Sequence, residues 1–428
     1  MRMKLKLGIG AASFVAASSA LAAAPIYIHA GRLMAVPGQA VRGAATIIVE
    51  GERIVAVRDG LVPPPAGATL IDLSDKTVLP GLIDSHVHLA SDRGGEAGLL
   101  SFVREEPQMN ALEAQMNGIK TLRAGFTTVR NLGDDGATLA LREAIKRGWV
   151  QGPRIVDAAS SISTTGGHMD GRGGLNDELV AHLPSPENLC DGVDACRKVV
   201  RRQIDRGADV IKFATTGGVN SGTGLATRMN EDEARALIET AHAYGRKVAV
   251  HAHGADGIKL ALRAGADSIE HGTVMDDEIL RTMKKQGTYY VPTLSTVNGY
   301  LERLAANPDA YAPDVKKQID WRIGITGQSL LKAVPAGVKI AFGTDAGVSK
   351  HGRNADEFEL MVKYGMTTAE AIKAATVNAA DLLGLASEVG TIEPGKSADI
   401  IAVEGDPLTD VRVLKAVRFV MARGAVVK

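Results

Sequence analysis

Six side chains able to bind metal ions or transfer protons occur in short apolar segments of the sequence. His86 and His88 lie in the segment 81–89, and side chains two residues apart on a strand face the same side. Lys212 lies in the apolar segment 208–215, where a free ammonium group is costly to bury. The other three candidates are His251, His271 and Asp345. Imidazole and carboxylate ligands suit zinc or another borderline divalent ion, so the set predicts a metal centre.

The lysine offers a bridging ligand for this predicted centre. Burial in an apolar strand makes a lysine lose its proton more easily. The free amine of Lys212 could then add CO2 and become a carbamate, an anion whose two oxygens can bind two cations. The alternative interpretation is a lysine at a strand end that reaches water.

Strands alternating with helices must bring these residues together. Eight strand candidates can be counted, at residues 81–89, 127–132, 154–160, 208–215, 247–253, 267–272, 288–294 and 339–346. Helical patterns such as 231–244 and 256–264 separate most of them. Such a repeat predicts an α/β protein with a (β/α)8 TIM barrel, whose active site forms at the carboxyl ends of the strands, where the six candidates fall. An open, doubly wound sheet is the alternative.

The two ends of the chain differ from this central region, 80–387. Residues 23–79 and 388–428 contain short β-rich runs separated by glycine and proline. Neither end is large enough for a convincing core alone, so we expect both to share one small β domain. Two separate surface sheets are the alternative.

The first residues have the pattern of a secretory signal peptide. Arg2, Lys4 and Lys6 precede an apolar stretch, and Ala20-Leu21-Ala22 fits an A-x-A cleavage site. A membrane anchor is the alternative, but the apolar run is short for spanning a bilayer. We therefore expect residues 1–22 to be removed and the protein to be exported, periplasmic or secreted, and soluble.

Charge and cysteine content narrow the choice of partners. Basic and acidic residues both number 49, and aromatic residues make up 4%, so neither nucleic acid nor an anionic membrane surface is an expected partner.

The cysteines are Cys190 and Cys196. In an exported protein such a pair can form a disulfide or stay reduced, and a zinc site is disfavoured because no further ligand lies near them.

Short motifs follow one another along nearly the whole chain. They are Pro80-Gly-Leu-Ile-Asp-Ser-His-Val-His, Gly125-Phe-Thr-Thr-Val-Arg-Asn, Thr165-Gly-Gly-His, Val210-Ile-Lys, Val250-His-Ala-His-Gly, Glu270-His-Gly, Gly343-Thr-Asp-Ala-Gly and Gly390-Thr-Ile-Glu-Pro-Gly-Lys-Ser-Ala-Asp-Ile. With these motifs the sequence resembles the metal-dependent amidohydrolase superfamily, most of all its imidazolonepropionase-like branch, which includes Xaa-Pro dipeptidases and ochratoxin-hydrolysing amidohydrolases.

This resemblance implies a centre with two metal ions. His86, His88 and Asp345 would hold the first ion, His251 and His271 the second, and carboxylated Lys212 would bridge them. A hydroxide between the ions would attack the substrate, with Asp345 accepting a proton and passing it to the leaving amine. The resemblance also implies that both chain ends form one small β-sandwich and that the protein is a homo-oligomer, for which octamers are known in this branch.

The same resemblance suggests the substrate contacts and the substrate class. His168 would lie near the substrate carbonyl, and His253 stands where related dipeptidases often have a tyrosine that contacts the substrate carboxylate. The expected substrates are amides next to a terminal carboxylate: Xaa-Pro dipeptides, N-acyl amino acids or ochratoxin A-like amides, cleaved in a dipeptidase- or carboxypeptidase-like reaction. Segments 220–229 and 348–354 are expected to line the pocket. A lactonase or deaminase on the same barrel, or a non-catalytic binding protein, are the alternatives.

Overall fold

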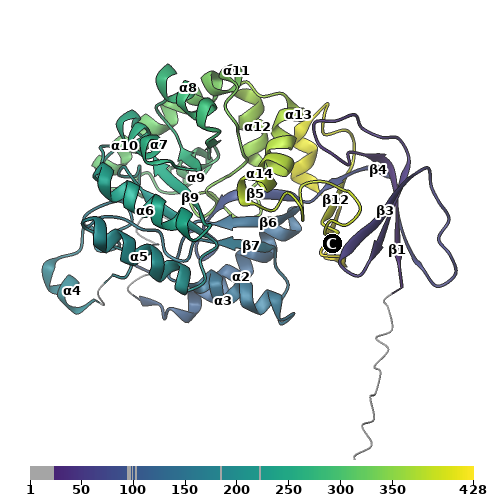
Figure 1. Ribbon diagram of the computed structural model, residues 1–428, viewed down its shortest axis with the longest axis horizontal. Coiled ribbons are helices and arrows are strands. Elements are labelled where there is room, and N and C mark those ends of the chain that lie inside the picture. Colours follow the sequence, from purple (N-terminus) through teal and green to yellow (C-terminus); the bar gives the residue numbers. More distant parts are fainter. Residues whose placement is uncertain (1–23, 94–97, 99, 102–103, 184–185, 221–222) are drawn as a thin grey trace, which may run out of the picture.

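The computed structural model describes residues 24–428 except 94–97, 99, 102–103, 184–185 and 221–222 (Figure 1). The expected signal peptide, residues 1–22, lies outside the described residues. Within the part of the chain that is described, no helix is both long and apolar enough to cross a membrane.

Two sheets of parallel strands form the centre of the molecule. The strands β5 (Leu82–Val87), β6 (Phe126–Asn131) and β7 (Arg154–Asp157) make a three-stranded sheet. The strands β8 (Val210–Ala214), β9 (Lys247–Ala252), β10 (Ser268–His271) and β11 (Tyr289–Val291) make a four-stranded sheet. Most of their residues are buried, as expected for apolar parallel strands covered on both faces. The strand order follows the chain in both sheets, without the reversal that a doubly wound sheet requires.

The eighth expected strand, 339–346, is not a regular strand. Among the described residues it pairs with neighbouring strands through single parallel bridges, between Ile340 and Tyr290 and between Ala346 and Val87. Asp345 has a φ of 55°, outside the extended region, which interrupts the ladder just before the second pairing. At the other edge, Ile162 pairs with Phe213. The two sheets are thus joined by single pairings, and no continuous sheet closes around them among the described residues.

Helices follow most of these strands and cover the sheets (Figure 1). Both helices expected from the sequence are present, as α6 (Glu231–Ala243) and α7 (Ala255–Ala264). A reciprocal capping box of Asn230 and Glu233 fixes the start of α6. The other α-helices are α2 (Gln108–Arg123), α3 (Ala137–Lys146), α4 (Asp177–His182), α5 (Val193–Asp205), α8 (Asp277–Gln286), α9 (Thr296–Ala306), α10 (Pro313–Ile325), α11 (Gln328–Ala336), α12 (Asp356–Lys363), α13 (Thr368–Lys373) and α14 (Ala379–Leu383). A π-helix (Ala374–Asn378) and a 3-10 helix (Val411–Ala416) complete them.

Both ends of the chain meet in one seven-stranded sheet beside the α/β part (Figure 1). Its strands are β1 (Ile26–Leu33), β2 (Ala45–Glu50), β3 (Arg53–Asp59), β4 (Thr69–Pro80), β12 (Ile400–Val403), β13 (Phe419–Ala422) and β14 (Ala425–Val426). The antiparallel pairing of β12 with β4 joins the two ends. The alternative of two separate surface sheets is therefore wrong. The seven strands hydrogen-bond as one sheet, so the second sheet of the expected sandwich is not seen among the described residues.

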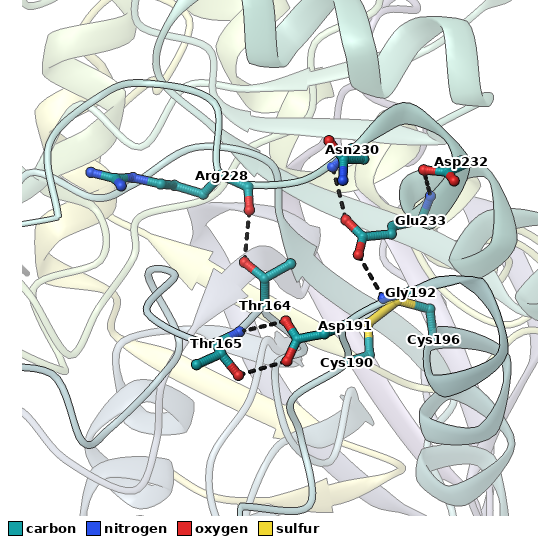
Figure 2. Close-up of a disulfide and its surroundings, with 10 residues drawn as sticks. All are labelled: Thr164, Thr165, Cys190, Asp191, Gly192, Cys196, Arg228, Asn230, Asp232 and Glu233. Carbon is teal, nitrogen blue, oxygen red and sulfur yellow. Dashed lines mark hydrogen bonds between the residues drawn. A yellow bond between two sulfur atoms is a disulfide. The ribbon is translucent and has the colours of Figure 1, made fainter.

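The two cysteines form a disulfide that ties the start of α5 to the preceding loop (Figure 2). Between them, the Gly192 amide donates to Glu233 of α6 at 2.7 Å, and the Asp191 carboxylate accepts from the amide and hydroxyl of Thr165 at 3.0 and 2.7 Å. The bridge thus stabilises a loop that contacts the segment leading to His168.

Replacing both cysteines with alanine should lower the free energy of unfolding by about 2 kcal/mol, because the bridge closes only a short loop in the unfolded chain. Urea unfolding of the wild type and the variant measures this difference. Adding a reductant should lower the midpoint of the wild type and leave that of the variant unchanged. Equal midpoints for the oxidised wild type and the variant would contradict a stabilising bridge.

Candidate metal centre

All eight predicted site residues line one cavity of about 130 Å³. His86, His251 and His271 lie in the carboxyl-terminal halves of β5, β9 and β10, and Lys212 lies at the middle of β8. His88 and His253 directly follow β5 and β9. Asp345 lies in the irregular eighth segment and His168 in the loop after β7. The alternation of strand and helix has therefore brought together residues separated by as many as 259 positions in the chain, 345 − 86.

His86, His88 and Asp345 form the first of two groups with converging ligand atoms. Nε2 of His86 and Nε2 of His88 each lie 3.4 Å from Oδ1 of Asp345. Nδ1 of His86 contacts Glu270 at 2.8 Å, and Nδ1 of His88 contacts the carbonyl oxygen of Gly133 at 2.9 Å. When each Nδ1 donates a proton to its acceptor, the Nε2 lone pairs are left for a cation.

The second group contains His251, His271 and also His253. Nε2 of His251 lies 3.2 Å from the Gly217 carbonyl oxygen, which leaves its Nδ1 as the ligand atom. In His253 and His271, Nδ1 contacts the hydroxyls of Thr273 and Thr293 at 2.7 and 2.8 Å. The geometry would let His253 bind a metal ion as its neighbours His251 and His271 could. Its expected separate role as a substrate contact therefore stays a prediction.

Lys212 is buried in the same cavity with only 1% of its surface exposed, so the interpretation of a strand-end lysine reaching water is wrong. Its Nζ lies 3.4 Å from Nε2 of His86. Burial lowers the pKa of Lys212 to about 8, against the opposing charges of Glu270 and Asp345. The amine is thus much easier to deprotonate than that of an exposed lysine, as addition of CO2 would require.

The donor set fits a divalent cation. Burial is the largest cause of a lowered pKa in every histidine of both groups, and it brings the pKa of His88 to about 4. The imidazoles are therefore neutral at physiological pH, the state in which they bind metals. Hydrogen bonds fix their orientation, and the ligand atoms within each group lie within 4.8 Å of one another.

A buried ionic network behind the first group was not foreseen from the sequence. Glu270 Oε2 contacts His86, while its Oε1 accepts from Arg130 at 2.8 Å and from the Ser268 hydroxyl at 2.5 Å. Arg130 also donates to the carbonyl oxygen of Ser85 at 2.6 Å. The sequence gives one indication of this network, because Arg130 and Glu270 lie inside apolar strands, where a buried charge needs a partner.

Backbone conformation also positions the ligands. His271 and Asp345 both have positive φ, 68° and 55°, which is unusual for residues other than glycine. Asp84 holds the segment before Asp345, since its carboxylate accepts from the Thr344 hydroxyl at 2.6 Å and from Asn354 at 2.8 Å. Such strained residues persist only where the surrounding contacts hold them, and they concentrate at functional sites.

Substituting Glu270 with glutamine should weaken zinc binding about 10- to 100-fold, because His86 loses its anionic partner. The variant should also be less stable, by about 3–5 kcal/mol, because Arg130 would stay buried without a counter-charge. Competition with a chromogenic chelator measures the affinity, and chemical denaturation the stability. Glu278→Gln, on the exposed side of α8, is the control and should change neither. Unaltered zinc affinity in the Glu270 variant would contradict a role in holding His86.

The remaining lining residues come from helices and loops beyond the strands. Asn220 and Val348 belong to the two segments expected to line the pocket. The lining also includes Met169, Thr296, Tyr300 and Arg322, which were not predicted from the sequence. The last three lie on α9 and α10, which follow β11, and no motif distinguished these helices from ordinary covering helices.

Comparison with known proteins gives consistent matches over nearly the whole chain. The Amidohydrolase family matches residues 77–427. An ochratoxinase of Aspergillus niger is 32% identical over 422 residues, covering 94% of this chain and 86% of that protein. A solved Xaa-Pro dipeptidase with methionine in its active site has a TM-score of 0.89 at 38% identity, covering 94% of this chain and 99% of that one. A solved prolidase in complex with N-methylphosphonate-L-proline has a TM-score of 0.85 at 32% identity, with coverages of 94% and 99%.

These matches agree with the α/β fold and with histidine groups able to hold a metal ion. The chain therefore belongs to the amidohydrolase family and is a hydrolase that acts on amide bonds.

Proposed function

We propose that this enzyme uses two divalent metal ions to cleave an amide bond next to a terminal carboxylate. The observation that carries the proposal is the pair of ligand groups around one cavity with Lys212 buried among them. The names of the similar proteins support the substrate class, since Xaa-Pro dipeptidase, prolidase and ochratoxinase all denote cleavage of amides that bear a nearby carboxylate.

His86, His88 and Asp345 would hold the first ion, His251 and His271 the second, and carboxylated Lys212 would bind both. Zinc suits this mixture of nitrogen and oxygen ligands. When bound, the two ions would supply an activated water and polarise the amide carbonyl.

Asp345 would act as the general base and then as the general acid. Burial raises the pKa of its carboxyl to about 7, although Lys212 lowers it. A group with such a pKa can take a proton from the attacking water and return it to the leaving amine near neutral pH. His168, whose ring lies 4.2 Å from that of His251, would contact the substrate carbonyl, and His253 would be a second substrate contact.

The wider architecture is part of the proposal. The two parallel sheets would be parts of one (β/α)8 barrel with 339–346 as its eighth strand, because single pairings at Ile162, Ile340 and Ala346 join their edges. Residues 23–79 and 388–428 would form the small domain beside the barrel, residues 80–387. We further propose export after removal of residues 1–22, to the periplasm or the medium, and assembly as a homo-oligomer.

A substrate screen with zinc and bicarbonate tests the function. Xaa-Pro dipeptides, N-acyl amino acids and ochratoxin A should be hydrolysed, and a chelator should abolish turnover. Lactones and aminated heterocycles test the lactonase and deaminase alternatives. Cleavage of lactones alone, or full activity of protein with less than one metal ion per chain, would overturn the proposal.

A further inference from the structure

Arg322 is a buried cation in the lining of the candidate active site. It lies near the end of α10, and only 3% of its surface is exposed. NH1 donates to the hydroxyl of Thr326 at 2.9 Å, and NH2 lies 3.5 Å from the carbonyl oxygen of Thr293. Both acceptors are neutral, and among the described residues no carboxylate lies within 4.0 Å of the guanidinium.

A buried guanidinium without an anion is unusual, because burying an unpaired charge is costly. Arginine cannot avoid this cost by losing its proton. Five N–H donors leave the side chain able to bind a further acceptor in addition to its two neutral partners. A ligand that enters the cavity could supply the missing charge.

The other side chains that line the cavity carry no competing permanent positive charge. Burial keeps its histidines neutral, and Lys212 would become an anion in the proposed metal centre. Arg322 is then the permanent cation among the lining residues. Arg322 lines the same cavity as Asp345 and His253, so a substrate held between the two groups would lie in the cavity that its guanidinium also lines.

We propose that Arg322 binds the terminal carboxylate of the substrate and thereby selects amides whose leaving amine carries that carboxylate. This inference rests on the proposed function and specifies how its substrate class is recognised. A guanidinium can hold a carboxylate through two parallel hydrogen bonds, which fixes its orientation as well as its charge. Tyr300 of α9 lines the same cavity, and burial raises the pKa of its phenol, so the hydroxyl stays protonated and can donate to the same carboxylate.

The size of the cavity supports recognition close to the reacting bond. Its volume of about 130 Å³ is below the roughly 300–1,000 Å³ of sites that enclose a whole drug-sized ligand. It can therefore enclose the reacting end of a substrate, with the amide and the adjacent carboxylate. A carboxylate at that end would meet Arg322 rather than solvent.

The experiment compares two substrates that differ only in the carboxylate, an N-acylphenylalanine and the matching N-acylphenethylamine. In Arg322→Gln, we expect kcat/KM for N-acylphenylalanine to fall about 100-fold, mainly through KM. The value for N-acylphenethylamine should stay within a few-fold of the wild type. Arg322→Lys should recover part of the loss. Lys317→Gln removes a cation from the exposed side of the same helix and should behave like the wild type.

A structural role for Arg322 predicts a different result. Its bond to Thr293 could support His271, and loss of that support would lower the rates of both substrates and the zinc content together. An equal loss for both substrates in Arg322→Gln would therefore overturn the inference. If that variant does not fold, the same comparison in Arg322→Lys decides it.

Calorimetric binding of L-phenylalanine and phenethylamine to the wild type and the variants separates this inference from the proposed function. A preference of the wild type for phenylalanine that is lost in Arg322→Gln and partly kept in Arg322→Lys supports carboxylate binding even where turnover is absent. An enzyme that hydrolyses both amides with equal kcat/KM retains its proposed chemistry and refutes the role of Arg322. An enzyme that hydrolyses neither refutes the proposed function alone.

Discussion

Replacing Lys212 with methionine should reduce kcat/KM at least about a thousandfold and reduce the zinc content of the purified protein. Methionine fills a similar volume, so the buried site should not collapse, but it cannot become a carbamate. In the proposed centre, loss of this anion would remove a ligand from both ions and with it several kcal/mol of transition-state stabilisation. Steady-state kinetics and elemental analysis of metal per chain measure the two effects.

Lys247→Met is the matched control for this prediction. Lys247 begins β9, away from the lining of the metal cavity, and its ammonium group donates to a backbone carbonyl of Asp381 at 2.8 Å. The control should keep its zinc and most of its activity. Growth with ¹³C-bicarbonate should give a carbamate NMR signal in the wild type and in the control, but not in the Lys212 variant. Full activity of Lys212→Met would eliminate the carbamate role.

Most strands that carry candidate ligands could be predicted from sequence because they are short apolar runs with a polar residue near one end, although Lys212 lies at the middle of β8. His86 on β5 and His251 on β9 follow this pattern, and parallel strands place such residues at the same edge. The pattern failed for the eighth segment. The positive φ of Asp345 breaks the regular pairing there, whereas an extended conformation was the natural prediction for the apolar start of the segment.

Contacts between distant parts of the chain could not be predicted in this way. Glu270 holds His86 across 184 residues of sequence, and this partnership depends on how two strands face each other. Arg322 lies on a helix whose sequence pattern only indicates packing. Its place in the site follows from the path of the chain after β11. The periodicity of apolar residues predicts a helix there but not the direction in which the chain runs. The residues of the two candidate ligand groups were thus within reach of sequence reasoning, whereas Glu270 and Arg322, which depend on contacts between distant segments, were not.

Asp345→Asn should lower kcat about a thousand- to ten-thousandfold while the fold is retained. An asparagine side chain keeps an oxygen ligand but cannot take a proton from the attacking water, and general acid–base groups contribute effects of this size. Asparagine also tolerates positive φ better than most residues, so the conformation at 55° should persist. The backbone bonds of this residue, from its amide to His86 O at 2.7 Å and from Val348 N to its carbonyl at 2.9 Å, are unaffected.

The dependence of kcat on pH distinguishes proton transfer from simple metal binding in this variant. A general base works only when deprotonated, so the wild-type rate should rise with pH as Asp345, whose pKa burial raises, loses its proton. Asp345→Asn should lose this rise, while KM should change little because the proposed substrate contacts are other residues. Asp314→Asn, exposed on α10, is the control and should keep both the rate and its pH dependence. If Asp345→Asn binds as much zinc as the wild type and keeps more than a tenth of its kcat, then Asp345 is a ligand only and another group must transfer the proton.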